Sequence, residues 1–227
     1  MAAVIDDPYD SAYARAYPGL YTDDPFWAPK HGFNRRVLAE MTAAPWCTSW
    51  IDLCCGQAPF FADAPPGLRC VGLDRSAAQL GAARRRYPEA AFTEADVLDA
   101  TACAGERFSL VTSFWGAYSY LGSATAVTAF IRRMAGLLAD AGALYLEVID
   151  PSRLAAFNAT AFARTHDFEV DVIDAARGDW RYRDAGGEHR LCSPPVACVR
   201  DAMADAGLVV EEIGDVQTMV QLVAWRG

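Results

Sequence analysis

Several features that would define other classes of protein are missing from this sequence. No apolar stretch is long enough to cross a bilayer, so we expect no membrane-spanning helix. The first residues include neither a basic region nor a long apolar core, so we expect no signal peptide and a cytoplasmic protein. Lys and Arg number 20 against 29 Asp and Glu, and the net charge is −9. This balance argues against nucleic acid or an anionic membrane as a partner.

Metal-binding and disulfide patterns are also missing. The seven cysteines are an odd number, and no pair of Cys-x-x-Cys motifs occurs among them. Cys54 and Cys55 are direct neighbours, a spacing that does not allow both to chelate one ion. We therefore expect no metal site and no disulfide framework, only reduced and largely buried thiols.

What the sequence does contain is an alternation of strand-like and helix-like segments. Its 227 residues, 53% of them hydrophobic, suit one large α/β domain, which we take to span 1–227. We predict a Rossmann-like seven-stranded, mostly parallel sheet with helices on both faces. The predicted strands are 49–53, 70–73, 91–93, 110–114 and 143–149, with a closing pair at 208–216 and 219–225. The predicted helices are 32–44, 76–86, 124–139 and 195–206, and 25–29 is expected to be a loop.

Two segments do not fit this alternation. At the N-terminus, Tyr9, Tyr13 and Tyr17 fall on one helix face, and Pro18-Gly19 is expected to end that helix. We interpret 1–45 as a helical lid, although a helix that packs its aromatic face on the body fits the same pattern. Residues 151–192 alternate in polarity at 169–173 and 180–184, with a turn signal at Gly186-Gly187, so we predict an antiparallel insertion after strand five. This insertion is compatible with a homodimer.

The turn after the first predicted strand is the most informative segment. An apolar run ends at Asp52, passes through small residues into a helix, and is followed by a second run ending at Asp74. This pattern predicts a βαβ unit that binds an adenosine-type cofactor at the carboxyl ends of parallel strands. Only Gly56 supplies one of the three glycines of a nicotinamide-binding turn, so NAD and FAD are disfavoured.

The segment Asp52-Leu-Cys-Cys-Gly-Gln-Ala58 resembles the first motif, D-L-G-C-G-x-G, of the class I S-adenosylmethionine (SAM) methyltransferases. Cys54 and Ala58 stand where that family has glycine. Further resemblances follow in the family's order at 71–76, 94–98, 108–115 and 137–147, the last resembling the L-K-P-G-G turn into strand five.

The resemblance implies SAM as the cofactor. It assigns Asp74 to the two ribose hydroxyls and Asp96 to the adenine amino group. It also brings Tyr17 near the methionine part, because 14–21 resembles the A-x-x-Y-D-x-x-Y opening of small-molecule N-methyltransferases. The full set of expected cofactor-binding residues is Tyr17, Asp52, Cys54, Gly56, Asp74, Arg75, Asp96, Val97 and Ser113. From the residues alone, each of the three acids, Asp52, Asp74 and Asp96, also has a structural interpretation as a helix cap or loop acid.

The loop after strand four, 114–121, concentrates aromatic side chains where the fold places the reacting methyl group. Aromatic faces attract cations, so this loop suits a sulfonium or a cationic substrate, while an apolar plug is the alternative. We expect Tyr17, Trp115 and Tyr118 to be catalytic. The expected substrate-binding residues are Tyr13, Tyr21, Tyr120 and Tyr182.

Candidate general bases are few. His166 and His189 lie in or beside the insertion, within reach of a substrate, but both are expected at the surface. Glu147 is a better-placed acid, or a cap.

The sequence therefore predicts a SAM-dependent methyltransferase acting at nitrogen or oxygen of a small molecule. One alternative is a SAM-consuming cyclase or lyase that makes azetidine-2-carboxylate and methylthioadenosine. The other is a non-catalytic SAM-binding protein. Fold alone does not separate them.

Overall fold

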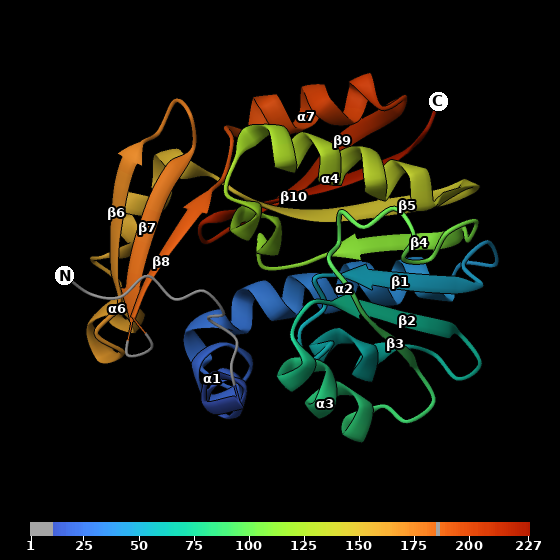
Figure 1. Ribbon diagram of the computed structural model, residues 1–227, viewed down its shortest axis with the longest axis horizontal. Helices are drawn as coiled ribbons and strands as arrows, with labels where there is room; N and C mark the ends of the chain where they lie inside the picture. The colour runs from blue at the N-terminus through green and yellow to red at the C-terminus, as the bar shows by residue number, and fades with distance from the viewer. Residues whose placement is uncertain (1–10, 185–186) are drawn as a thin grey trace.

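The computed structural model describes residues 11–184 and 187–227. Its centre is a seven-stranded sheet in the order β3-β2-β1-β4-β5-β10-β9, in which β10 alone runs antiparallel to both its neighbours and the other pairings are parallel (Figure 1). The strands are β1 Ser49–Leu53, β2 Arg69–Asp74, β3 Ala91–Glu94, β4 Phe108–Ser113, β5 Leu138–Ile149, β9 Leu208–Val216 and β10 Met219–Arg226. The predicted fold class is confirmed.

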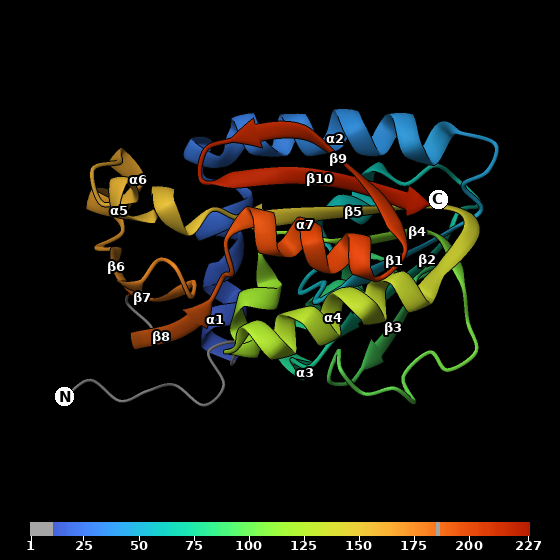
Figure 2. The ribbon, with the colours of Figure 1, turned by 90° about the horizontal axis from the view of Figure 1, so that it is seen from above.

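Helices cover both faces of this sheet, as predicted. Helix α2, Ala28–Ala43, lies on one face, and α4, Ala124–Leu137, and α7, Val196–Asp205, lie on the other (Figure 2). Helix α3, Ala77–Arg86, contributes Leu80 to the same core cluster as Leu38 of α2. Both core clusters are built from strand residues that alternate between the two faces, so each face of the central strands is buried.

The N-terminal boundaries differ from the prediction. Helix α1, Ser11–Tyr17, does not end the helical backbone, because Pro18–Thr22 continues it as a π-helical turn. Pro18 has no N–H to donate to the Ala14 carbonyl, which instead accepts a hydrogen bond from Gln57 Nε2 at 2.6 Å. Likewise the expected loop 25–29 is a 3-10 turn, Pro25–Trp27, followed directly by α2, which carries its proline in the first turn. Tyr9 lies outside the described residues.

Strand β5 also begins earlier than predicted. It starts at Leu138, so the residues expected to form the turn into strand five are part of the strand. Its pairing with β4 is irregular between Phe108 and Leu110, which accommodates the extra length. The first crossover is a short 3-10 helix, Pro59–Asp63, and the loop after β4 contains another, Ala117–Leu121.

The insertion after β5 is antiparallel, as predicted. The turn Pro151–Arg153 and the short helices α5, Leu154–Phe157, and α6, Ala161–Thr165, precede a three-stranded sheet. Its strands are β6 Glu169–Asp174, β7 Asp179–Asp184 and β8 Gly187–Cys192. Gly186, half of the predicted turn signal, lies outside the described residues.

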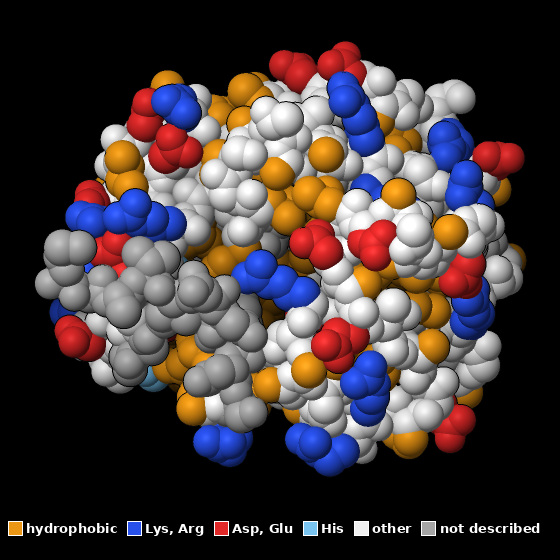
Figure 3. Space-filling view, in the orientation of Figure 1, with side chains coloured by type: hydrophobic (Ala, Val, Ile, Leu, Met, Phe, Trp, Pro, Cys, Tyr) orange, Lys and Arg blue, Asp and Glu red, His pale blue; other side chains and the backbone are white. Residues whose placement is uncertain are grey.

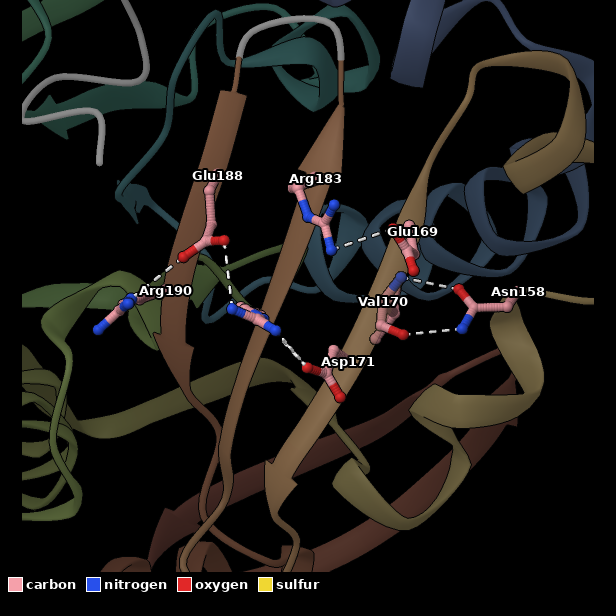
Figure 4. Close-up of polar contacts among 8 residues, drawn as sticks. Asn158, Glu169, Val170, Asp171, Arg183, Glu188 and Arg190 are labelled. Carbon is pink, nitrogen blue, oxygen red and sulfur yellow. Dashed lines mark hydrogen bonds and ion pairs between the residues drawn. The ribbon is translucent and has the colours of Figure 1, made fainter. Parts of the chain in front are cut away.

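Alternation of side chains along the strands divides the insertion sheet into two faces. The polar face carries cross-strand ion pairs: Arg181 with Asp171 and Glu188, Arg183 with Glu169, and Arg190 with Glu188 (Figure 4). The amide of Asn158 pairs with the backbone N–H and C=O of Val170, extending the edge of the sheet. The other face carries Val170, Trp180, Tyr182, His189 and Leu191, all buried. This second face is the one turned toward the main domain, where it joins a common apolar cluster.

Charges of both signs are scattered over the face seen in Figure 3, and the described residues drawn there form no continuous basic patch. Within 11–184 and 187–227, no helix has the length and apolar character that crossing a membrane requires.

Candidate active site

Two cavities meet above the carboxyl ends of the parallel strands. The first, called here the cofactor cavity, lies over β1 and β2; the second, the aromatic cavity, lies between the loop after β4 and the insertion sheet. Three side chains line both of them: Tyr17, Trp115 and Tyr120. These residues come from the N-terminal helix and the loop after β4, so tertiary contact between distant segments creates the wall that the two cavities share.

The turn after β1 forms one side of the cofactor cavity. Cys54 has φ 56°, Gly56 φ 53° and Ala58 φ 50°, so three alternate residues adopt the left-handed conformation. Side chains with a Cβ are strained there, which explains why glycine is usual at such positions. Cys54 and Gly56 line the cavity as expected, while Ala58 is fully buried beneath it.

Asp74, at the end of β2, connects the turn after β1 with the start of α3. One carboxylate oxygen accepts a hydrogen bond from the Gly56 N–H and the other from the Ser76 N–H, both at 2.8 Å. Burial raises the pKa of Asp74, and these backbone donors oppose that effect. A carboxylate has about four acceptor sites, so these backbone donors do not saturate Asp74, and it can also accept from a ligand in the cavity that it lines.

The cofactor cavity fits an adenosine-type ligand. Arg75, Asp96 and Val97, which were expected to bind the cofactor, all line it. The side-chain amide of Gln79 also lines it, is buried, and has no hydrogen-bond partner for either polar atom among the described residues. A buried amide without partners is costly, and a ligand with both donors and acceptors would satisfy it. Sequence reasoning missed Gln79, because a glutamine on a helix gives no signal by itself.

Four expected site residues lie elsewhere. Asp52 and Ser113 are buried beneath the cofactor cavity without lining it. Asp52 accepts a hydrogen bond from Thr112 Oγ1 at 2.7 Å, and burial raises its pKa well above the usual value. Tyr118 is fully buried in the core, where its hydroxyl accepts the Ile149 N–H at 3.2 Å, so it does not reach either cavity. Tyr13 lies behind Tyr21, to whose hydroxyl it donates at 3.0 Å.

A buried polar network fixes Trp115. This residue has φ 63°, an uncommon conformation for a bulky side chain. Its N–H donates to Glu147 Oε2 at 2.7 Å, and Lys30 Nζ lies 3.3 Å from the centre of its ring. Lys30 and Glu147 themselves form an ion pair of 3.1 Å with both side chains fully buried. The carboxylate and the ammonium therefore hold the backbone and the ring of Trp115 in place.

This network was not predicted. Asn34 and Gln221 donate to the other oxygen of Glu147, at 3.0 and 3.4 Å. Lys30 is the only lysine in the chain, which is the one signal that singles it out in the sequence. Burial lowers its pKa to about 8, and the charge of Glu147 opposes this. Beside it, burial and the Lys30 charge lower the pKa of His31 to about 4, so His31 is neutral at neutral pH.

The aromatic cavity is apolar and no charged side chain is among its described lining residues. These are Tyr17, Tyr21, Trp27, Trp115, Gly116, Tyr120, Ile149, Leu154, Phe157, Phe168, Val170, Trp180, Tyr182, Leu191, Thr218 and Met219. Tyr21, Tyr120 and Tyr182, which were expected to bind substrate, all line this cavity. The aromatic rings that line this space also contact one another, from edge-to-face pairs such as Tyr21 on Trp115 to the stacked Trp27 and Phe157.

The two histidines of the insertion have different environments. His166 is partly exposed and pairs with Asp24 at 2.9 Å. His189 is buried, contrary to the expectation of a surface position. Strand alternation explains the difference, because His189 falls on the same face of β8 as Leu191 and opposite Tyr182 of β7. No group of three or more potential ligands within the described parts of the chain is arranged to hold a metal ion.

Comparison with known proteins agrees with this geometry. Residues 51–142 match the family model described as a methyltransferase domain. No curated protein matches the sequence. Among solved structures, the sugar N-methyltransferase KedS8 from Streptoalloteichus is 22% identical, with 100% of this chain and 97% of that chain covered and a TM-score of 0.67.

Two further structures are similar over nearly their whole length. DesVI from Streptomyces venezuelae is 20% identical, with 96% of this chain and 99% of that chain covered and a TM-score of 0.67. The amino pentose methyltransferase CalS10 from Micromonospora echinaspora, solved with SAM bound, is 22% identical. The match covers 98% of this chain and 100% of that chain, with a TM-score of 0.64. At these identities the structures establish the fold.

Proposed function

Since this chain carries a methyltransferase domain in the class I fold and has SAM as its cofactor, we propose that it methylates a nitrogen or oxygen atom of a small molecule. The observation that carries the proposal is the wall shared by the two cavities. Methyl transfer is an in-line displacement, so donor and acceptor must lie on either side of a single reacting carbon. Two cavities that share Tyr17, Trp115 and Tyr120 provide that arrangement.

We assign the cofactor cavity to SAM. The free acceptor sites of Asp74 would bind the ribose hydroxyls, and Asp96 and the unpartnered Gln79 amide would bind the adenine between apolar side chains such as Val97. Tyr17 and Trp115 would place their aromatic faces beside the sulfonium, an interaction worth about 0.5–2 kcal/mol depending on desolvation.

The chemistry asks for alignment more than for reactive groups. Bound SAM supplies an activated methyl group. The protein's residues then hold the acceptor in line and keep water out, and such alignment lowers barriers by roughly 7–11 kcal/mol. Trp115 suits this task because the buried Lys30 and Glu147 fix both its ring and its backbone.

The aromatic cavity would bind the acceptor. Its apolar, uncharged lining favours a reacting group that enters without a net charge and is flanked by apolar surface. The printed names of two similar structures, a sugar N-methyltransferase and an amino pentose methyltransferase, support nitrogen as one acceptor atom. The apolar lining equally accommodates a phenolic oxygen.

The comparisons give no support to the two alternatives. A cyclase or lyase acting on SAM would form methylthioadenosine without an added acceptor, and a non-catalytic protein would bind SAM and turn over nothing.

The test begins with calorimetric titration of SAM into the full-length protein. Mass spectrometry then follows incubation with SAM and a panel of amines, phenols and amino sugars. S-adenosylhomocysteine that appears only with an acceptor, together with the methylated acceptor, is the expected result. Absence of SAM binding, or methylthioadenosine formed from SAM alone above its spontaneous background, refutes the proposal.

A further inference from the structure

A hydrogen-bonded chain of titratable side chains runs from the shared wall of the two cavities into the insertion sheet. The Tyr120 hydroxyl contacts the Tyr182 hydroxyl and lies 3.4 Å from His189 Nδ1. On the far side of the ring, His189 Nε2 lies 3.3 Å from Asp184 Oδ1. Tyr182 stacks on the His189 ring at 4.2 Å between centroids with an interplanar angle of 8°, which fixes the ring's orientation.

The order of these groups is that of an acid–base relay. A carboxylate beside one imidazole nitrogen favours the tautomer protonated there, which leaves a lone pair on the other nitrogen. With Nε2–H directed at Asp184, the Nδ1 lone pair faces the Tyr120 hydroxyl. Hydrogen bonds of 3.3–3.4 Å are long, yet catalytic contacts of this kind commonly tighten when substrate binds.

The remaining phenols near the cavity are less suited to accept a proton by themselves. Burial raises the pKa of Tyr13, Tyr17 and Tyr21, and each stays a neutral phenol at physiological pH. Imidazole is the side chain that gains and loses protons near neutrality. His189 itself does not line the aromatic cavity, so Tyr120, which lines both cavities, is the residue through which it reaches a substrate.

We propose that Asp184, His189 and Tyr120 form a proton relay that removes the proton of the methyl acceptor, an inference that rests on the function proposed above. Tyr120 is the catalytic residue that touches the acceptor. His189 and Asp184 act through it. The substrate class that needs this relay is one whose nucleophilic atom enters the apolar cavity still protonated, such as a phenol or hydroxyl.

With a phenol as acceptor, methyl transfer and proton transfer occur together. An electron pair on the acceptor oxygen forms the new O–CH3 bond while the S–CH3 bond of SAM breaks and its electron pair stays on sulfur. The phenol proton passes to the Tyr120 oxygen as the Tyr120 proton passes to His189 Nδ1. The resulting imidazolium is stabilised by the Asp184 carboxylate, and it returns the proton to solvent once the cavity opens for product release.

Four described titratable groups lie around the His189 ring, and they come from β7, the loop after β4 and α1. Asp184 and Tyr182 belong to β7, and Tyr120 belongs to the loop after β4. Tyr13 belongs to α1, and the centroid of its ring lies 6.2 Å from the centroid of the His189 ring. Asp184 is the one acid among them. The pH dependence of turnover is therefore assigned to this cluster as a unit.

The first test is independent of any acceptor. The full-length protein contains three histidines, so ring-15N labelling gives three sets of signals, assigned with the His166→Gln and His189→Gln variants. We expect His189 in its neutral form to carry its proton on Nε2, and the Asp184→Ala variant to shift it toward a mixture of tautomers. A proton on Nδ1 in the unaltered protein, or tautomers unaffected by Asp184→Ala, overturns the relay.

The second test separates a chemical from a structural role. Two acceptors are compared with SAM: p-cresol, which must lose a proton, and 4-methylpyridine, which reacts through a lone pair and has none to lose. His189→Gln is expected to slow p-cresol methylation by about 100-fold or more at neutral pH and to recover part of the rate as pH rises, because general-base catalysis contributes about 10²–10⁴-fold. Methylation of 4-methylpyridine is expected to change by less than about threefold, by the same reasoning.

His166→Gln is the matched control, since it removes the other histidine of the insertion without touching the relay. An equal slowing of both acceptors by His189→Gln indicates a structural role and overturns the proposal. If His189→Gln does not fold, Tyr120→Phe breaks the relay at its other end and must reproduce the selective loss. Failure of the unaltered protein to methylate either compound counts against the proposed acceptor class, while the tautomer of His189 still decides the relay.

Discussion

The buried Lys30 offers the sharpest quantitative prediction. It is the only lysine in the chain, its side chain is fully buried, and its ammonium contacts Glu147 at 3.1 Å. Burial lowers its pKa from 10.5 to about 8. The change proposed is Lys30→Met, which keeps an unbranched apolar chain of similar length while removing the charge.

The magnitude follows from the pKa difference. Between pH 8 and 10.5 the unfolded chain holds a proton on Lys30 that the folded protein has lost, so folding releases a proton in this window. Stability therefore rises with pH there, and the difference in pKa corresponds to about 3 kcal/mol. The destabilising effect of the charged, buried lysine is fully present below pH 8 and is absent above 10.5.

At neutral pH, Lys30→Met also has a destabilising effect, which opposes the stability gained by removing the buried ammonium. Removing Lys30 leaves the Glu147 carboxylate buried with hydrogen-bond donors from Asn34, Gln221 and the Trp115 N–H, but no countercharge. Breaking a buried pair in this way costs about 3–5 kcal/mol. The double variant Lys30→Met/Glu147→Gln is expected to recover at least half of that loss, because no charge is then left unpaired.

The assay is urea denaturation of the single and double variants at several pH values, combined with NMR of the lysine 13Cε signal. With one lysine there is one signal, and its midpoint is expected near pH 8. In the unfolded chain cysteines and tyrosines titrate in the same range, whereas burial raises the pKa of Cys55, Cys70 and Tyr21 in the folded protein. The difference between the unaltered protein and Lys30→Met is therefore the quantity to follow. A midpoint near 10.5 with a difference in stability that does not change with pH refutes this reasoning.

Three further changes test the cofactor cavity and its supports. Asp74→Ala is expected to weaken SAM binding by about 1–3 kcal/mol in calorimetry, by leaving the ribose hydroxyls without an acceptor, and unchanged affinity would mean that the ribose lies elsewhere. Cys54→Gly is expected to raise the free energy of unfolding by about 1 kcal/mol, since Cys54 adopts φ 56° and glycine is unstrained there; a loss of stability would show that the thiol's packing matters more. Ser76→Ala removes the cap that accepts the Gln79 N–H at 3.3 Å and is expected to lower thermal stability by about 1 kcal/mol, whereas no change would assign the cap to Asp74 alone.

Local sequence signals identified the fold because they depend on backbone and burial patterns within single segments. The run ending at Asp52, the small-residue turn and the run ending at Asp74 correspond to β1, the tight turn and β2, and the family match covers the same region. The alternation at 169–173 and 180–184 likewise became β6 and β7. The same reasoning misplaced helix boundaries at prolines. Pro18 does not end the helical backbone, and Pro25 and Pro29 lie in the first turn of helical segments, where proline is favoured.

Residue types alone did not separate site from core in the loop after β4. Tyr118 and Tyr120 are two positions apart in sequence, yet Tyr118 is buried against Phe130 and only Tyr120 reaches the cavities. The 3-10 turn at 117–121 decides which aromatic side chain faces outward, and its geometry depends on left-handed residues at both ends, Gly116 and Gly122.

The sequence by itself determined the sheet, the cofactor turn and the alternating insertion, since each of these is encoded by neighbouring residues with a strand or helix period. Only the tertiary structure decided that Lys30 would meet Glu147 across 117 positions, and that Tyr120 would meet His189 across 69. The physical reason is that burial and pairing of charged groups depend on which faces pack together. No local pattern specifies that choice, and it is made when the N-terminal helices and the insertion close over the ends of the strands.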